Sequence, residues 1–246
     1  MSKLLSADFA RLFMSKTFRI IMVICFAMGP LFNLVNMSGS DQKTLAGSVE
    51  PGVLFLLPMM LTAVMGLNVV SEFTNGSIRN KIMIGHSRRA ICFSWIIVYT
   101  AVMLTMFAVF FGTAFLSGRL MGFDMAGIEA GKLAANTGVM LCSLLTNLIF
   151  SLTVCVAFAD YRGLAVLYLL MEFPVVGFSL ISMAYPESKV LKFIFRFFTG
   201  GLMTDHLSLS LLTWPDKGWL TVLCTLSFGA VLLAVLLRHF SAKDLK

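Results

Sequence analysis

Six continuous apolar segments, each long enough to cross a bilayer as a helix, constrain the fold of this chain more than any other feature. A hydrocarbon core of about 30 Å requires roughly 20 apolar residues per helix. Because the segments are continuous and do not alternate with a period of two, they predict helices and exclude a membrane barrel. The segments are Phe18–Val35, Gly52–Val70, Ala90–Leu116, Leu133–Phe158, Leu164–Met183 and Trp219–Leu237.

Composition leads to the same fold class. Hydrophobic residues make up 59% of the chain, charged residues only 13%, and the mean hydropathy is +0.92, whereas a soluble domain is about half apolar and a quarter charged. We therefore predict an all-α integral membrane protein. The net charge of +7 comes from basic residues at the ends of apolar segments, which favours contact with lipid headgroups and argues against a nucleic-acid partner.

The distribution of charge predicts the orientation. Basic residues are concentrated before the first span and after the second, and the positive-inside rule places both segments in the cytoplasm. With six spans, both termini of this multi-pass protein are expected on the cytoplasmic side of the plasma membrane. The basic residues are Lys3, Arg11, Lys16 and Arg19 in the first segment, and Arg79, Lys81, Arg88 and Arg89 in the second.

We expect a single transmembrane domain over residues 1–246. Its predicted parts are an interfacial helix at 1–17, spans one and two within 18–70, a cytoplasmic segment at 71–89, spans three to five within 90–183, an outer loop at 184–218, span six at 219–237 and a tail at 238–246. The first helix is predicted from the i, i+4, i+7, i+8 spacing of Leu5, Phe9, Leu12 and Phe13, which gives an amphipathic surface helix. A signal-anchor flank is the alternative.

The outer loop contains cations at helical spacing among aromatic residues. Lys189, Lys192 and Arg196 follow i, i+3, i+7, and Phe193 and Phe197 lie between and after them. This pattern predicts a re-entrant or interfacial helix at the outer surface. The alternative is that the loop belongs to a span with different boundaries.

Motifs for catalysis on this chain are missing. Residues 39–44 (GSDQKT) lack the glycine that precedes the lysine of a phosphate-binding loop. His86, His206 and His239 are far apart, and the five cysteines have no CxxC spacing, so neither a metal site nor a disulfide framework is indicated. We predict no catalytic residue, no metal and no cofactor on this chain.

Glu172 is the clearest ionisable residue within a predicted span, two residues before the helix-kinking Pro174. A charge at this depth costs several kcal/mol and normally faces a cavity or a partner. Functional roles open for Glu172 are a position on a substrate path or a pair across a subunit interface. Structural roles are a hydrogen bond to a neighbouring helix or a protonated carboxyl group. Asn68, Asn136 and Asn147 are expected to add hydrogen bonds between spans, and Asn68 is a further candidate for the substrate path.

The segment SEFTNGSIRNKIMIGHSRR at 71–89 is the most distinctive local pattern. Asn75 and Gly76 predict a turn after the second span, and Ile78 and Ile82 place two apolar residues on one face of a short basic helix. A helix this short is unstable alone because nucleation is costly, so it must pack against another surface.

This segment resembles the stretch between the second and third spans of ABC-2 type transporter permeases, where an E-F-x-x-G-[ST]-[IL]-[RK] pattern is typical. The pattern appears here as Glu72, Phe73, Gly76, Ser77, Ile78 and Arg79. The resemblance extends over the whole chain: an amphipathic start, six spans, a long outer loop before the last span and a short tail.

The resemblance implies an exporter subunit that dimerises with a second permease copy and recruits two copies of a separate ABC ATPase, on which ATP and Mg would bind. It implies an amphipathic or hydrophobic substrate such as a peptide, antimicrobial or drug, and Glu72 and Arg79 as the first candidates to transmit motion. The residues expected to couple to the ATPase are Glu72, Phe73, Asn75, Gly76, Ser77, Ile78, Arg79, Lys81, Ile82 and His86.

Two other functions can be compared with the exporter. A non-transporting membrane anchor or sensor could tether a cytoplasmic ATPase through the same segment. An ion channel or proton-coupled carrier would need more buried charges than Glu172 provides.

Overall fold

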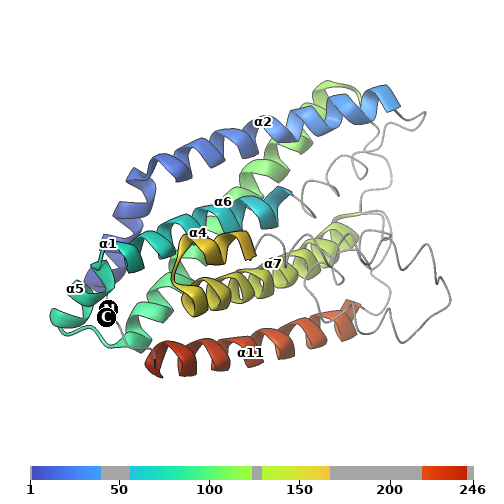
Figure 1. Ribbon diagram of the computed structural model, residues 1–246. Coiled ribbons are helices and arrows are strands. Elements are labelled where there is room, and N and C mark those ends of the chain that lie inside the picture. The colour runs from blue at the N-terminus through green and yellow to red at the C-terminus, as the bar shows by residue number, and fades with distance from the viewer. Residues whose placement is uncertain (1, 40–55, 124–128, 167–217, 243–246) are drawn as a thin grey trace.

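The computed structural model describes residues 2–39, 56–123, 129–166 and 218–242, and these residues form helices and short connections without a strand. Figure 1 shows the helices as a bundle of long, roughly aligned rods. The helices are α1 (Ser2–Met14), α2 (Lys16–Gly39), α4 (Leu57–Thr74), α5 (Ser77–Met83), α6 (Arg88–Leu120), α7 (Ala130–Phe158) and α11 (Gly218–Ala242).

Five of these helices, α2, α4, α6, α7 and α11, have the length and apolar composition needed to cross a membrane. This is the pattern of a multi-pass helical membrane protein. The helical prediction is confirmed for five of the six apolar segments. The fifth predicted span begins at Leu164, and beyond residue 166 it lies outside the described residues.

The observed helices extend past the apolar segments that predicted them, because polar residues near the ends continue the backbone hydrogen bonding. The predicted second span ends at Val70, but α4 continues to Thr74. Helix α2 begins after Ser15, whose Oγ accepts a hydrogen bond from the backbone N–H of Phe18 at 3.2 Å. Helix α6 begins after Ser87, whose Oγ accepts from the N–H of Ala90 at 3.2 Å. Both serines therefore act as N-caps.

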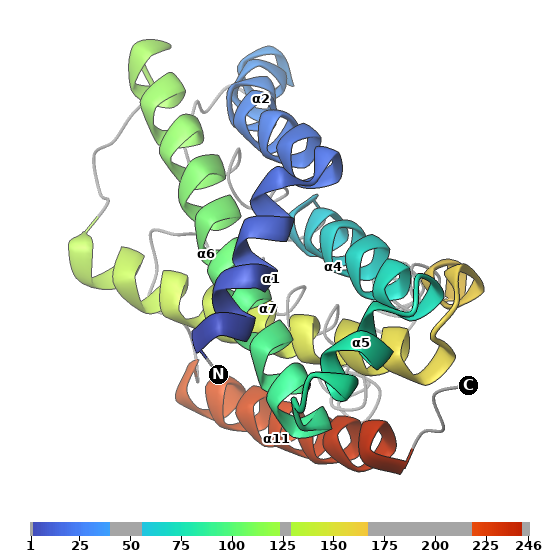
Figure 2. The same ribbon diagram turned by 90° about the vertical axis from the view of Figure 1, so that its left-hand side faces the viewer.

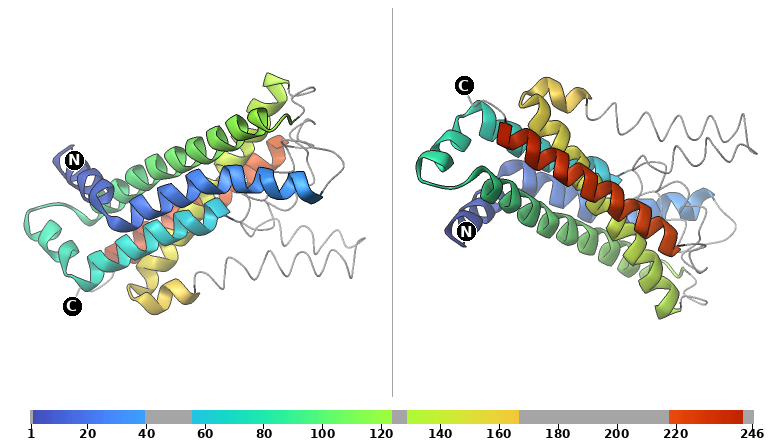
Figure 3. Two further views of the ribbon diagram at one scale, coloured as in Figure 1. Left: turned by 90° about the horizontal axis from the view of Figure 1, so that it is seen from above. Right: turned by 90° about the horizontal axis from the view of Figure 1, so that it is seen from below.

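The short helices α1 and α5 and the C-terminal end of α11 lie at one end of the bundle (Figures 1 and 2). We call this end the α5 end. Helix α2 packs along α6, and α7 packs against α4 and α11, as the two views of Figure 3 show. The α5 end therefore brings together residues that are far apart in the sequence.

Close backbone approach joins α2 to α6. A Cβ atom added at Gly29 would lie 2.8 Å from the backbone nitrogen of Ala114, so only glycine allows this approach. One turn later, the buried amide of Asn33 donates to the carbonyl of Ala114 and to Ser117 Oγ, both at 2.7 Å. Small residues and side-chain hydrogen bonds are the usual means by which membrane helices associate.

Hydroxyl groups join α7 to its two neighbours. Ser151 on α7 hydrogen-bonds to Thr62 on α4 at 3.2 Å, and Thr146 Oγ1 donates to the backbone oxygen of Thr225 on α11 at 3.1 Å. The amide of Asn147 lies between these two levels of α7 and is buried, and neither of its polar atoms has a hydrogen-bond partner in the described part of the chain. The contact between spans predicted for Asn147 is therefore not seen among these residues.

The inward face of α1 differs from the predicted apolar stripe. Leu4, Asp8 and Leu12 are buried, with a spacing of four, whereas Phe13 is mostly exposed. The buried face of α1 is therefore offset by about one residue position from the face that contains Leu5 and Phe9. The physical reason is Asp8, whose carboxylate has cationic and hydroxyl partners inside the protein.

Candidate functional site

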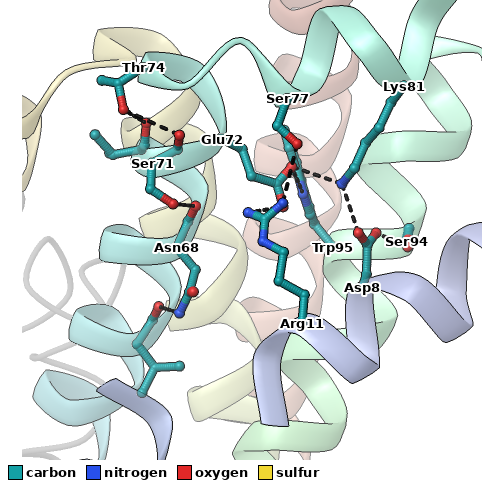
Figure 4. A network of polar contacts seen from close by, with 12 residues as sticks. Asp8, Arg11, Asn68, Ser71, Glu72, Thr74, Ser77, Lys81, Ser94 and Trp95 are labelled. Atoms are coloured by element: carbon teal, nitrogen blue, oxygen red, sulfur yellow. Dashed lines mark hydrogen bonds and ion pairs between the residues drawn. The ribbon is translucent and has the colours of Figure 1, made fainter. Parts of the chain in front are cut away.

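A cluster of buried ion pairs lies at the α5 end, where α1, α4, α5 and α6 meet (Figure 4). We call it the ion-pair cluster. Each helix contributes at least one member, so the polar contacts span four segments of the chain. Its members are Asp8 and Arg11 from α1, Glu72 from α4, Ser77 and Lys81 from α5, and Ser94 and Trp95 from α6.

Lys81 is the central cation. Its Nζ lies 2.7 Å from Asp8 Oδ1 and 2.8 Å from Glu72 Oε2, and only 13% of the side chain is exposed. A single ammonium group therefore pairs with carboxylates from α1 and α4 at once. Lysine suits this position because its three donors sit on one compact charge.

Glu72 is the most enclosed acid in the cluster, with 5% of its side chain exposed. Oε1 pairs with Arg11 Nη2 at 2.9 Å, while Oε2 accepts from Lys81 and, at 3.2 Å, from the indole N–H of Trp95. Both carboxylate oxygens are thus occupied by charged or strong donors. These contacts fix the end of α4 to three other helices.

The remaining contacts complete the cluster at its edges. Ser94 Oγ donates to Asp8 Oδ2 at 2.7 Å, so the second oxygen of this carboxylate is also satisfied. Arg11 Nη1 donates to Ser77 Oγ at 3.3 Å, which joins α1 directly to the first residue of α5. Arg11 is the most exposed of the four charged residues, at 39% of its side chain.

The cluster is electrically balanced, with two carboxylates and two cations. Desolvating an ion costs several kcal/mol, and this cost is offset only when the partner charges and hydrogen bonds are well placed. Removing one partner leaves an uncompensated buried charge, which costs about 3–5 kcal/mol. These charges therefore hold the four helices in one relative arrangement, because separating any pair would leave an uncompensated buried charge.

An aromatic group connects the cluster to α11. The ring of Trp95 lies 5.4 Å from that of Phe240 and 6.1 Å from that of Phe73, measured between ring centroids. Beside it, Arg88 Nη1 donates to the backbone oxygens of Phe240 at 3.2 Å and Ser241 at 3.0 Å. Carbonyls in the last turn of α11 are thereby satisfied by a cation from α6.

Helix α5 is short, and its position depends on its surroundings. Gly76 precedes it with φ of 67°, a left-handed conformation that glycine adopts without a steric penalty. Ile78 is buried against the bundle, and Ile82 is half-buried. The predicted turn and short helix are both confirmed, and the surface against which the helix packs is the bundle itself.

The far side of α5 is exposed and partly apolar. Met83 and Ile84 are 76% and 78% exposed, and Arg79 is also exposed and has no ion-pair partner among the described residues. Arg79 is therefore not the partner of Glu72 in this structure; Arg11 and Lys81 are. The segment thus has one side fixed to the bundle and one side available to another molecule.

The other predicted site residues divide into two groups. Asn68 donates from its amide to the carbonyl of Val64 at 2.7 Å, so it bonds within its own helix, and no bond to a neighbouring span is seen in the part of the chain that the structure describes. Asn75 is exposed and His86 is half-buried. The remaining predicted positions lie outside the described residues: Glu172, Pro174, Lys192, Phe193, Arg196 and Phe197.

Sequence reasoning missed four members of the ion-pair cluster as site residues: Asp8, Arg11, Ser94 and Trp95. The available signal was the spacing of Leu4, Asp8 and Leu12, which puts an acid in the middle of an apolar stripe. An acid at such a position needs a buried partner.

Among the described residues, no group of three or more His, Cys, Asp or Glu side chains is arranged to hold a metal ion. In comparisons with known proteins, no family model and no curated protein matches this chain. The site is therefore interpreted from its own geometry, in which charges hold a short exposed helix against the ends of membrane-spanning helices.

Proposed function

We propose that this chain is the membrane subunit of an ATP-driven exporter of the ABC-2 type, which moves an amphipathic or hydrophobic substrate out of the cell. The observation that carries the proposal is the two-sided environment of α5. Lys81 joins this helix to α1 and α4, while Met83 and Ile84 next to it are exposed. A segment with this geometry can receive a force from outside and pass it to the spans.

In the proposed mechanism, a separate ABC ATPase binds the exposed side of α5 around Arg79, Met83 and Ile84. ATP and Mg bind on that partner, and its closure displaces α5. Because Lys81 holds both Asp8 and Glu72, a displacement of α5 moves α1 and the end of α4 with it. Two-state rearrangements of this kind commonly exchange ion pairs at an interface, and Arg79, which has no ion-pair partner among the described residues, is a cation to which Glu72 could transfer.

The arrangement of the helices supports the six-span topology that we propose. Helix α7 ends towards the α5 end, and α11 begins at the opposite end of the bundle (Figure 1). One further crossing between them, by the predicted fifth span, satisfies this geometry. We place the α5 end in the cytoplasm because α1, α5 and the start of α6 carry the excess of basic residues. A re-entrant outer helix and a second permease copy complete the proposed assembly.

The first experiment tests the docking surface. The chain is co-expressed with the ABC ATPase encoded nearest to its gene, and the two proteins are co-purified in detergent. We expect the double substitution Met83→Ser and Ile84→Ser to reduce recovery of the ATPase at least tenfold without changing the melting temperature of the chain. Leu120→Ser is the matched control, because Leu120 is equally exposed but lies at the end of α6 remote from α5.

The second experiment tests transport. The purified pair is reconstituted into vesicles, and ATP-dependent movement of a fluorescent amphipathic peptide is measured together with ATP hydrolysis. The exporter proposal predicts movement that requires ATP and is lost in the Met83 and Ile84 variant. ATPase binding without movement of any peptide or drug tested would instead identify a membrane anchor.

A further inference from the structure

A groove between α6 and α11 at the α5 end combines two arginines with an apolar floor. It has a volume of about 700 Å³, within the range of roughly 300–1,000 Å³ that is usual for ligand sites. We call it the basic groove. Its lining residues are Arg89 and Phe93 from α6, and Ala234, Leu237, Arg238, Ser241 and Ala242 from α11.

We propose that the basic groove binds the phosphate headgroup of an anionic phospholipid, with an acyl chain lying along its apolar part. The proposal does not depend on the transport function, since it rests on the membrane character of the chain and on the groove itself. Basic pockets between membrane helices are a general means of binding acidic headgroups.

The charge of the groove favours an anion. Among the described residues, the lining includes two guanidinium groups and no acid, and neither Arg89 nor Arg238 has an ion-pair partner in that part of the chain. Arg89 also lies in the first turn of the long helix α6, where the helix dipole adds partial positive charge. A phosphate group can accept hydrogen bonds from both guanidinium groups.

The order of residues along both walls matches the polarity of a lipid. Phe93 lies four residues further along α6 than Arg89, which is about 6 Å deeper towards the middle of the bundle. On α11, which runs towards the α5 end, Ala234 lies four residues before Arg238 and hence deeper by the same amount. Both walls therefore place a cation near the end of the bundle and apolar atoms towards its centre.

The walls are held in place by protein contacts alone. Arg88, next to Arg89, donates to the backbone oxygens of Phe240 and Ser241, and the rings of Trp95 and Phe240 are in contact. The two helices are thus fixed beside each other (Figure 2), and a lipid would enter a site that is already formed.

Binding is measured by titrating the purified full-length chain, in a neutral detergent, with dioctanoyl phosphatidylglycerol. Dioctanoyl phosphatidylcholine and inorganic phosphate are titrated in parallel. We expect saturable binding of one phosphatidylglycerol per chain, at least tenfold tighter than phosphatidylcholine. Equal binding of the two lipids would show that the headgroup charge is not recognised and would overturn the proposal.

The variants identify the site. The double substitution Arg89→Gln and Arg238→Gln is expected to weaken phosphatidylglycerol binding about 30-fold, given the usual contribution of each basic residue at a membrane surface. The double Arg→Lys variant keeps both charges and should bind within a few-fold of the original chain. Arg162→Gln is the control, because Arg162 is an exposed arginine outside the groove. An equal loss in the control, or none in the double Gln variant, would place the lipid elsewhere.

A final variant separates the lipid from a free anion. Ala234→Phe fills the apolar part of the groove and should weaken phosphatidylglycerol at least fivefold without affecting inorganic phosphate. If Ala234→Phe has no effect and inorganic phosphate displaces the lipid completely, the groove is a phosphate site and the lipid assignment is wrong.

Discussion

The indole nitrogen of Trp95 donates to Oε2 of Glu72, the same carboxylate oxygen that accepts from Lys81. A residue in the first turns of α6 thus supports the acid at the end of α4, and its ring contacts Phe240 on α11. The side chain of Trp95 therefore contacts both the charged cluster and the aromatic residues of the site. Displacing Glu72 would disturb both at once.

The exposed fraction of each charged side chain predicts how strongly its substitution destabilises the protein. Glu72→Gln leaves two cations against one acid in a buried setting and should lower the free energy of unfolding by about 3–5 kcal/mol. Arg11 is 39% exposed, so Arg11→Gln should cost only about 1 kcal/mol. Denaturant unfolding of the detergent-solubilised chain measures both values. An equal effect of the two substitutions would show that burial does not set these energies.

The charge balance of the ion-pair cluster predicts that a second substitution restores part of the stability lost in the first. Lys81→Met alone leaves one buried negative charge in excess, whereas combining it with Asp8→Asn restores neutrality and keeps the pair of Arg11 and Glu72. The double variant should therefore be more stable than the sum of the single effects by about 0.5–3 kcal/mol, the usual range for contacting residues. Additive losses in the same unfolding assay would contradict direct coupling between Lys81 and Asp8.

The backbone at Gly76 predicts a clear difference between two substitutions. A Cβ atom there would meet nothing within 4 Å, so the only constraint is the positive φ of 67°. Gly76→Asn should be tolerated because asparagine adopts this region, whereas Gly76→Val should cost about 1–2 kcal/mol. If α5 couples to an ATPase, valine should also reduce stimulated ATP hydrolysis. Equal behaviour of the two variants would exclude a role for this conformation.

The contact between α2 and α6 predicts a steric effect. Gly29→Ala places a Cβ against the backbone of α6 and should destabilise the chain by about 1–3 kcal/mol through overpacking. Gly112→Ala is the matched control on α6, since nothing lies within 4 Å of its added Cβ, and it should stabilise by about 0.5–1 kcal/mol. Melting temperatures should therefore shift in opposite directions.

The buried amide of Asn147 predicts a stabilising substitution. Both of its polar atoms are without partners in the described part of the chain, and an unsatisfied buried group costs about 1–3 kcal/mol. Asn147→Leu should raise stability by a similar amount, whereas Asn33→Leu should lower it, because Asn33 donates to Ala114 and Ser117. A loss of stability in Asn147→Leu would mean that this amide has a partner beyond the described residues.

Helix positions could be predicted from the sequence because in a membrane each spanning segment must satisfy its own backbone hydrogen bonds. Apolar length alone therefore located α2, α4, α6, α7 and α11. The exact ends could not be predicted in this way, because Ser15 and Ser87 act as caps outside the apolar segments. The six-span count and the outer re-entrant helix stay predictions.

The site was predicted only in part. The pattern after the second span identified Glu72, Gly76 and Lys81, because these residues are close in sequence. Asp8 and Arg11 reach the same site from α1. Asp8 lies 73 positions before Lys81 in the sequence, and no local sequence pattern indicates that their side chains are in contact. The basic groove was missed for the same reason, since its arginines come from α6 and α11.

The four charged members of the ion-pair cluster all precede residue 82, and Ser94 and Trp95 follow shortly after. During synthesis they leave the ribosome before α7 and α11 exist, so these charges can neutralise one another while the rest of the polypeptide is still being translated. Phe240 lies near the end of the chain, so its contact with Trp95 can form only after the final helix has been synthesised.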